Sequence, residues 1–219
     1  MWTIKGSASI RTWSILLVCG LLTLPASAQR FNFNIGGGPG FPLGKTNDLA
    51  NISYNFVAGG GLDLRPHVKV NTEFMFHGLP VGKSAADQLG VSEIKGRLYS
   101  LTGNLILGSE VGGGKGAYLI AGGGWYRRTL EAQETTFQAG TKCAPLWVWW
   151  NVQCIDGIFP TDVTVGSRTS SAGGFNVGGG LTFPIGDSGA YFYTEIRYHR
   201  AFTANVDTEI LPVTFGIRW

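Results

Sequence analysis

Apolar and polar residues alternate along most of this chain, in runs of about ten residues separated by turn residues. Because successive side chains of a strand point to opposite faces, this alternation predicts half-buried β-strands. In the clearest run, residues 68–77, one face carries Val68, Val70, Thr72, Phe74 and Phe76, and the other carries Lys69, Asn71, Glu73, Met75 and His77. Eight strands are predicted, at residues 31–38, 52–64, 68–77, 97–108, 117–128, around 175–183, 190–202 and 208–219. The fifth has apolar residues on both faces, so its register stays open.

The predicted connections alternate in length. Those at 65–67, 110–115 and 186–189 are short and rich in glycine or proline, whereas those after the first, third and fifth strands are longer, and the one after the seventh strand is brief. The longest, residues 129–170, is predicted to be an irregular loop. An even number of strands with alternating short and long connections predicts an all-β, eight-stranded antiparallel up-and-down transmembrane β-barrel. The apolar-face aromatics fall into two bands, one at each end of the strands, as expected at the two interfaces of a membrane.

The last predicted strand, residues 208–219, has a continuous apolar face that ends in Phe215, Ile217 and Trp219. We expect it to pair with residues 31–38 and so to close the barrel. Pro212 lacks a backbone N–H, and the outer part of this closing seam is therefore predicted to be poorly paired.

The first 28 residues read as a secretory signal peptide. Lys5 and Arg11 precede an apolar run at 13–24, and Ala26-Ser27-Ala28 forms a small-residue cleavage site, so cleavage is expected near Ala28. Residues 29–219 are then predicted to form one barrel domain. Without Lys5 and Arg11, the 17 basic and 14 acidic residues leave a net charge of about +1, which argues against a nucleic-acid partner.

Taken together, the signal peptide, the alternating strands, the 191–200 segment and the Phe215/Ile217/Trp219 ending resemble the OmpA/OmpX-like outer-membrane β-barrels. The resemblance covers the whole mature chain. It implies the outer membrane of a diderm bacterium, contact with outer-membrane lipid, and assembly by periplasmic chaperones and the insertion machinery. It also implies that the terminal strand is the signal which that machinery reads. No peptidoglycan-binding domain is expected after the barrel, so cell-wall anchoring does not carry over.

Charged residues on the inward faces need partners in a low-dielectric interior. An eight-stranded barrel is just wide enough to be filled by its own side chains, which favours a packed network over the alternative of a narrow, gated path for small solutes. The six predicted members are Asp63, Lys69, Glu73, Glu195, Arg197 and Arg218.

Cys143 and Cys154 are the two cysteines of the predicted mature chain, and an oxidising compartment favours a disulfide between them. A metal site is disfavoured because no histidine lies near them in sequence. The interval between them carries Trp147, Trp149 and Trp150. These tryptophans are predicted either to form an exposed surface for membrane, glycan or protein contact or to fold onto the loop's own core or the rim of the barrel.

No catalytic or cofactor site is predicted. Residues 40–46 resemble a phosphate-binding loop, but Pro39 occupies the position of its first glycine. A lipid A-modifying hydrolase would need a serine beside Glu195 and His199, and the strand at 190–202 has none. A soluble lipocalin-like ligand carrier would need the reverse polarity of the strands. The sequence therefore favours a non-enzymatic outer-membrane protein with a role in envelope integrity or surface adhesion.

Overall fold

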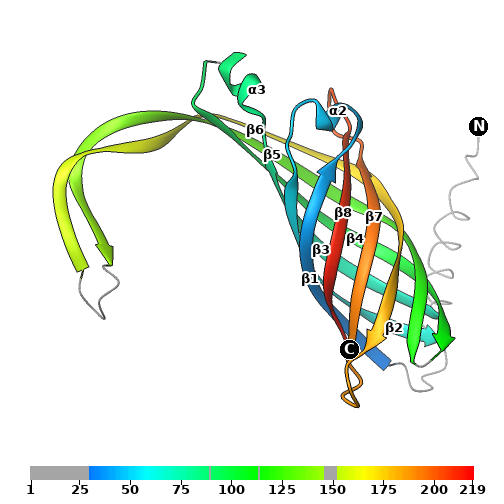
Figure 1. Cartoon of the computed structure of the whole chain (residues 1–219). Coiled ribbons are helices and arrows are strands. Elements are labelled where there is room, and N and C mark those ends of the chain that lie inside the picture. Colours follow the sequence, from blue (N-terminus) through cyan, green and yellow to red (C-terminus); the bar gives the residue numbers. More distant parts are fainter. Residues whose placement is uncertain (1–29, 89, 113, 146–151) are drawn as a thin grey trace, which may run out of the picture. The chain divides into compact units, whose positions relative to one another are not determined.

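The computed structural model describes residues 30–88, 90–112, 114–145 and 152–219. Eight antiparallel strands follow one another around a closed ring in chain order, and β1 pairs with β8 (Figure 1). The strands are β1 (Arg30–Pro42), β2 (Ser53–Arg65), β3 (Val68–Pro80), β4 (Glu93–Gly112), β5 (Lys115–Pro145), β6 (Val152–Pro184), β7 (Tyr191–Ala201) and β8 (Thr208–Arg218). Two short helices, α2 (Gly44–Asn47) and α3 (Lys83–Gln88), follow β1 and β3. The predicted all-β up-and-down barrel is confirmed.

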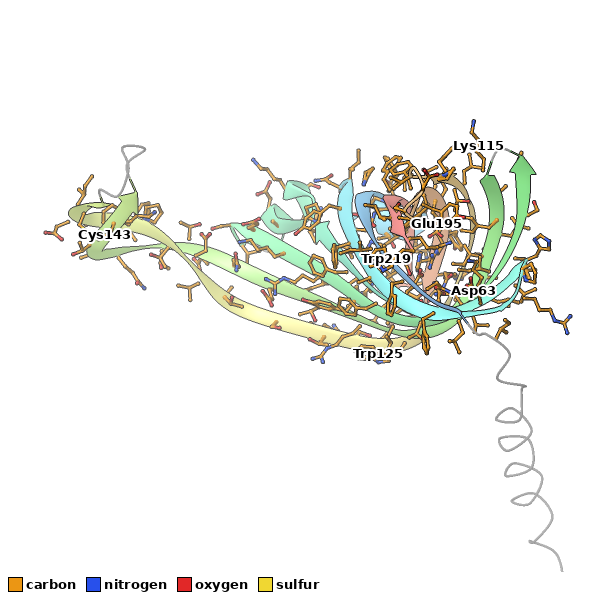
Figure 2. The ribbon with its side chains drawn as sticks, turned by 90° about the horizontal axis from the view of Figure 1, so that it is seen from below. Asp63, Lys115, Trp125, Cys143, Glu195 and Trp219 are labelled. Carbon is orange, nitrogen blue, oxygen red and sulfur yellow. A yellow bond between two sulfur atoms is a disulfide. The ribbon has the colours of Figure 1, made fainter. Side chains whose placement is uncertain are left out.

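The alternation along the strands separates a polar interior from an apolar exterior. In β7, Glu195 and Arg197 are buried, whereas Phe192 and Ile196 are exposed. Figure 2 shows Glu195 inside the ring of strands and Trp125 outside it. Such a surface would be unfavourable in water, because apolar area is driven out of contact with it. It suits a bilayer, where ring closure also pairs the backbone groups that lipid cannot hydrogen-bond.

The register of β5, left open by its sequence, is clear in the structure. Tyr118, Ile120 and Tyr126 are buried, whereas Leu119 and Trp125 are exposed. The even-numbered residues of this part of β5 therefore face the interior.

Glycines with positive φ close two of the short turns. Gly112 and Gly114 have φ values of 109° and 74° between β4 and β5, and Gly186 and Gly189 have values of 55° and 73° between β6 and β7. A side chain would be strained at these positions. The short connections share one end of the barrel, and the connections with α2 and α3 share the other.

The segment 129–170 is not an irregular loop, and this prediction is wrong. The pairing of β4 with β5 ends at Glu93 opposite Gln133, but β5 and β6 stay paired as far as Pro145 opposite Val152. The pairs beyond Gln133 form a two-stranded antiparallel ribbon, residues 134–145 and 152–163, which we call the outer ribbon (Figure 1). Several other strands are also longer than predicted, and α3 occupies part of a stretch predicted to be a loop.

The closing seam between β1 and β8 stays paired past Pro212, contrary to the prediction. Gly40 pairs with Pro212, and the ladder continues to Pro42 opposite Ile210. The β1–β8 ladder lapses instead beside Pro39, where residues 38 and 39 have no partners on β8. Pro212 interrupts the other ladder of β8, the one with β7, where residues 211 and 212 have no partners. At the first lapse the Asn55 side chain donates hydrogen bonds to the backbone carbonyls of Gly38 (2.9 Å) and Pro39 (3.1 Å). The Asn55 side chain thus satisfies two backbone carbonyls at this interruption.

Candidate functional site

The centre of the barrel interior is organised around the Glu73 carboxylate on β3, which is 1% exposed. Its Oε1 accepts hydrogen bonds from the side-chain amides of Asn34 and Asn71, both at 2.9 Å. Its Oε2 accepts one from Asn104 at 3.1 Å and one from the Arg197 guanidinium at 2.5 Å. Four donors from four strands therefore converge on one buried carboxylate, which offsets much of the desolvation of its charge.

Arg197 joins this carboxylate to a second one on its own strand. Its Nε donates to Glu195 at 2.8 Å, its terminal nitrogen forms a salt bridge with the same carboxylate, and Tyr118 donates to Glu195 at 2.9 Å. Arg218 lies over the rings of Tyr118 and Tyr193, 4.9 and 5.0 Å from their centroids. These are cation–π contacts rather than ion pairs.

Asp63 and Lys69 form a separate pair close to the β2–β3 turn. Lys69 Nζ lies 2.9 Å from the Asp63 carboxylate, which also accepts a hydrogen bond from Asn32 at 2.6 Å. The six charges predicted to share one network therefore divide. Glu73, Glu195 and Arg197 form the central cluster, Arg218 stacks beside it on tyrosine rings, and Asp63 and Lys69 pair elsewhere.

The Arg197–Glu73 bond crosses the barrel. β3 and β7 are four strands apart in a ring of eight, so these residues project from opposite walls. A side-chain bond across the diameter occupies the bore at this level, and an open water path through it would require the bond to break.

Further from the short-turn end, the interior becomes apolar. Leu79, Leu98, Tyr126, Ala201 and Ile210 pack into one buried cluster. Tyr126 of this cluster also contacts a histidine, because His199 Nδ1 lies 3.0 Å from its hydroxyl. The rings of His77 and His199 in turn meet edge to face, with their centroids 5.9 Å apart. This packing adds a second closure to the bore.

Reasoning from the sequence missed the uncharged members of the interior network. The amides of Asn34, Asn71, Asn104 and Asn176 all point inward, and Asn176 donates to Asn104 at 2.9 Å. Their signal was present in the sequence, because each occupies an inward position in the alternation. Asparagine is uncharged, however, and a pattern of opposite charges does not reveal it.

The described residues show no arrangement for nucleophilic catalysis. No serine hydroxyl among them hydrogen-bonds a histidine, and Glu195 is committed to Arg197 and Tyr118. The described part of the chain contains no group of three or more His, Cys, Asp or Glu side chains placed to hold a metal ion. Among those same residues no helix is both long and apolar enough to cross a membrane.

Exterior aromatics gather at two levels. At the short-turn end Phe33 packs against Trp219 at 6.2 Å, and Phe183 against Phe192 at 6.4 Å. Phe215 and Ile217, on the same face of β8 as Trp219, are also exposed. Towards the other end of the strands a band continues across β2, β3 and β4, and its members are Tyr54, Phe74, Phe76 and Tyr99. Aromatic side chains concentrate in this way at the two interfaces of a bilayer.

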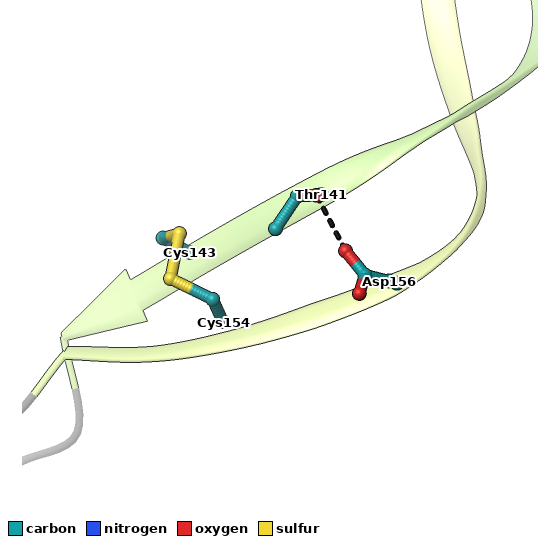
Figure 3. The surroundings of a disulfide bond; sticks show 4 residues. All are labelled: Thr141, Cys143, Cys154 and Asp156. Atoms are coloured by element: carbon teal, nitrogen blue, oxygen red, sulfur yellow. Dashed lines mark hydrogen bonds between the residues drawn. A yellow bond between two sulfur atoms is a disulfide. The ribbon is translucent and has the colours of Figure 1, made fainter.

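The outer ribbon carries the disulfide and exposes apolar side chains. Cys143 and Cys154 are cross-strand partners joined by a disulfide, and nearby Thr141 donates a hydrogen bond to Asp156 (Figure 3). Phe137 and Ile158 are 74% and 71% exposed. The predicted contact residues Trp147, Trp149 and Trp150 lie outside the described residues, as does the predicted signal peptide.

No protein-family model matches the chain, and no curated protein matches it by sequence. Among solved structures, neisserial surface protein A (NspA) aligns over 88% of this chain and 98% of its own length, with a TM-score of 0.57 and 10% identity. Ail of Yersinia pestis aligns over 87% and 97% (TM-score 0.43, 11% identity), and the N-terminal barrel of Pseudomonas aeruginosa OprF over 88% and 100% (TM-score 0.43, 10% identity). The chain thus has the fold of small outer-membrane β-barrels, as the resemblance implied.

Proposed function

We propose that the chain is a non-enzymatic integral outer-membrane protein whose barrel anchors the outer ribbon at the cell surface, where the ribbon serves in adhesion. The apolar exterior and its two aromatic bands support the membrane location. The expected signal peptide at residues 1–28 provides the route to that compartment.

The interior supports an anchor in preference to a pore. Glu73 and Arg197 meet across the bore, and the cluster around Leu98 fills the level beyond them. The centre of the interior is also occupied by the hydrogen-bonded groups around Glu73 and Arg197, where a lipocalin-like carrier would need an apolar chamber.

The adhesive role rests on one observation, which is that the two long edges of the outer ribbon are unpaired. β4 pairs with β5 only as far as Gln133, and β7 pairs with β6 only beyond Gly174, so both long edges of the ribbon lack a neighbouring strand. An exposed edge presents unpaired backbone groups that can take up an extended segment of another protein. Phe137 and Ile158 add exposed apolar area on one face of the ribbon, because Ile158 pairs with Ala139, which lies two residues from Phe137 on the same face.

The test is to remove the ribbon and keep the barrel. Residues 134–163 would be replaced by Asn-Gly, a dipeptide that closes a tight hairpin between Gln133 and Thr164. Bacteria carrying either form would be compared for attachment to epithelial cells and to immobilised matrix proteins. We expect attachment to fall to the level of cells that lack the protein.

The control is the gel migration of unboiled protein, which reports whether the shortened barrel is folded. Equal attachment by the folded, ribbonless form would overturn the adhesive role. Increased sensitivity to detergents in cells lacking the whole protein, but not in cells with the ribbonless form, would favour a role in envelope integrity instead.

A further inference from the structure

A hollow lies on the outward face of the barrel, across β3, β4 and β5. It lies towards the outer ribbon and has a volume of about 330 Å³. We call it the arginine–aromatic pocket, and the lining residues that matter for its chemistry are Phe74, Arg97, Tyr99, Trp125, Arg127 and Glu131. The pocket combines two guanidinium groups with three aromatic rings on a surface that otherwise faces lipid.

The strand register places both arginines on the same face. Tyr99 pairs with Arg127, and Arg97 pairs with Thr129, so the two arginines are diagonal neighbours on β4 and β5. Diagonal neighbours in an antiparallel pair are separated by roughly 7–8 Å, a gap that two long side chains can close around one anion. Guanidinium groups bind phosphate through paired N–H donors, which makes arginine well suited to this geometry.

The positive charge of the pocket is incompletely neutralised. Arg97 lies 3.2 Å from the Glu131 carboxylate, but Arg127 forms no salt bridge with any described residue. Lys95 is the next residue of β4 on the same face and lies 3.4 Å from Glu93. The region therefore holds three cations, Lys95, Arg97 and Arg127, but only two carboxylates among the residues just named, Glu93 and Glu131. The surface leaves a place for one more negative charge.

Arg200 offers a contrast to Arg127. It also faces outward, near the outer end of β7, with its guanidinium 5.7 Å from the Phe202 ring. Asp207 lies 2.8 Å from it and Glu209 3.8 Å, so two carboxylates surround one cation. A basic side chain at a similar level therefore exists in a compensated setting, and it provides a matched control.

The depth of the pocket indicates the kind of anion. Phe74 and Tyr99 belong to the upper aromatic band, 6.3 Å apart, and Trp125 is 46% exposed in the same region. Such bands mark the boundary between hydrocarbon and headgroups. Arg127 lies two residues further out than Trp125 on β5, or about 7 Å along the strand. The guanidinium groups therefore lie at the level of lipid phosphates, and the rings lie at the level of the adjoining sugar or upper acyl chain.

We propose that the arginine–aromatic pocket binds the phosphate of a phosphorylated lipid in the outer leaflet. Arg127 supplies the uncompensated charge, the guanidinium of Arg97 donates both to the phosphate and to Glu131, and Trp125 and Tyr99 pack against the lipid next to the phosphate. The proposal rests on the membrane location proposed above and is independent of the adhesive role. It assigns the pocket a ligand of stated chemistry, which distinguishes it from general contact with the bilayer.

The experiment measures lipid bound to the purified, folded full chain in detergent by native mass spectrometry. The probes are lipid A with its phosphates and the same lipid A after enzymatic dephosphorylation. We expect the phosphorylated form to bind at least about tenfold more tightly, and Arg127→Gln to remove most of that preference, because each charged hydrogen bond to phosphate contributes strongly. Arg97→Gln should have a smaller effect, because Glu131 already shares that charge. Arg200→Gln should bind like the unaltered protein.

Each other outcome has a definite meaning. Equal binding of both probes, or an unchanged preference in Arg127→Gln, would overturn the proposal. Displacement of the lipid by inorganic phosphate alone, at the same potency as by lipid A, would show an anion site without lipid recognition and would also overturn it. Gel migration of each unboiled variant confirms that it is folded, and membrane fractionation of cells tests the location separately. Failure of the membrane location is thereby distinguished from failure of the pocket.

Discussion

Replacing Arg197 by methionine would remove the guanidinium that bridges Glu73 and Glu195 while keeping much of the side-chain length. Both carboxylates are buried, with side chains 1% and 2% exposed. Neither can gain water in compensation without opening the packed interior. The substitution therefore leaves two buried negative charges that no longer have a cation between them.

The size of the effect follows from this geometry. Removing one partner of a buried ion pair is destabilising by about 3–5 kcal/mol, because the remaining charge is left uncompensated. Glu73 keeps its three asparagine donors and Glu195 keeps Tyr118, which places the expected loss near the lower end, at about 3 kcal/mol. Adding Glu73→Gln to Arg197→Met removes one of the stranded charges. The double variant should therefore be less unstable than the sum of the two single variants, by about 1–3 kcal/mol.

Lys69→Met is the matched control. Its salt bridge with Asp63 has a similar length, 2.9 Å, but the two side chains are 32% and 26% exposed. Partly exposed pairs contribute about 1 kcal/mol or less, so this variant should unfold close to the unaltered protein.

The assay is urea unfolding of protein inserted into lipid vesicles, with the folded fraction read from gel migration without boiling. The midpoint should fall markedly for Arg197→Met and little for Lys69→Met. Equal midpoints for these two variants would refute the reasoning, because they would show that the charge crossing the barrel does not stabilise it. Additive effects in the double variant would show that Glu73 and Arg197 are not energetically coupled.

Three further predictions concern the bore, the ribbon and two glycines. Purified protein in planar bilayers should give no steady open-pore current, because the Arg197–Glu73 bond crosses the interior, and a steady current would contradict an occupied bore. Changing Cys143 and Cys154 to serine should leave the gel migration of the barrel unchanged but increase proteolysis within residues 134–163, since closing a loop of this length is worth about 2–3 kcal/mol to a ribbon that is marginal alone. Unchanged proteolysis would show that the ladder alone holds the ribbon. Gly36→Ala should lower the free energy of unfolding by about 1–3 kcal/mol, seen as a lower urea midpoint, because its Cβ would lie 2.6 Å from the Tyr193 hydroxyl and 2.7 Å from the Phe215 carbonyl oxygen. Gly103→Ala, where no atom lies within 4 Å of the added Cβ, should be neutral or slightly stabilising, and equal losses at both glycines would contradict this steric account.

The barrel could be predicted from the sequence because lipid and interior impose opposite demands on neighbouring residues. Phe74 faces outward and Glu73 faces the interior, and outward and inward residues alternate in this way along the strands of the ring. The inward placement of Glu195 and Arg197 followed from the same rule. Their partners did not, because the Glu73–Arg197 bond depends on the relative heights of β3 and β7, which no local pattern encodes.

The outer ribbon was missed for the converse reason. Both of its faces are exposed, so Phe137 on one face and Ile155 on the other experience similar surroundings, and no inside–outside alternation is selected. Pro212 was misjudged because a strand in a barrel has two neighbours. A missing N–H affects only the neighbour towards which it would have pointed, and for Pro212 that neighbour is β7 rather than β1.

The central cluster and the exterior of this protein differ in whether their charges and strands have partners within the chain. This difference separates the scaffold from the parts that can bind another molecule. In the central cluster each charge has a partner within the chain, and Glu73 alone has four donors. On the exterior, Arg127 in the arginine–aromatic pocket forms no salt bridge with any described residue, and the long edges of the outer ribbon have no neighbouring strand. A charge without a partner and a strand without a neighbour are unfavourable unless something outside the chain supplies the missing group. If so, substitutions in the central cluster should change stability without changing the lipid preference of the folded protein, and Arg127→Gln should change the lipid preference without changing stability. The urea and lipid-binding measurements on the same set of variants decide whether the two properties separate in this way.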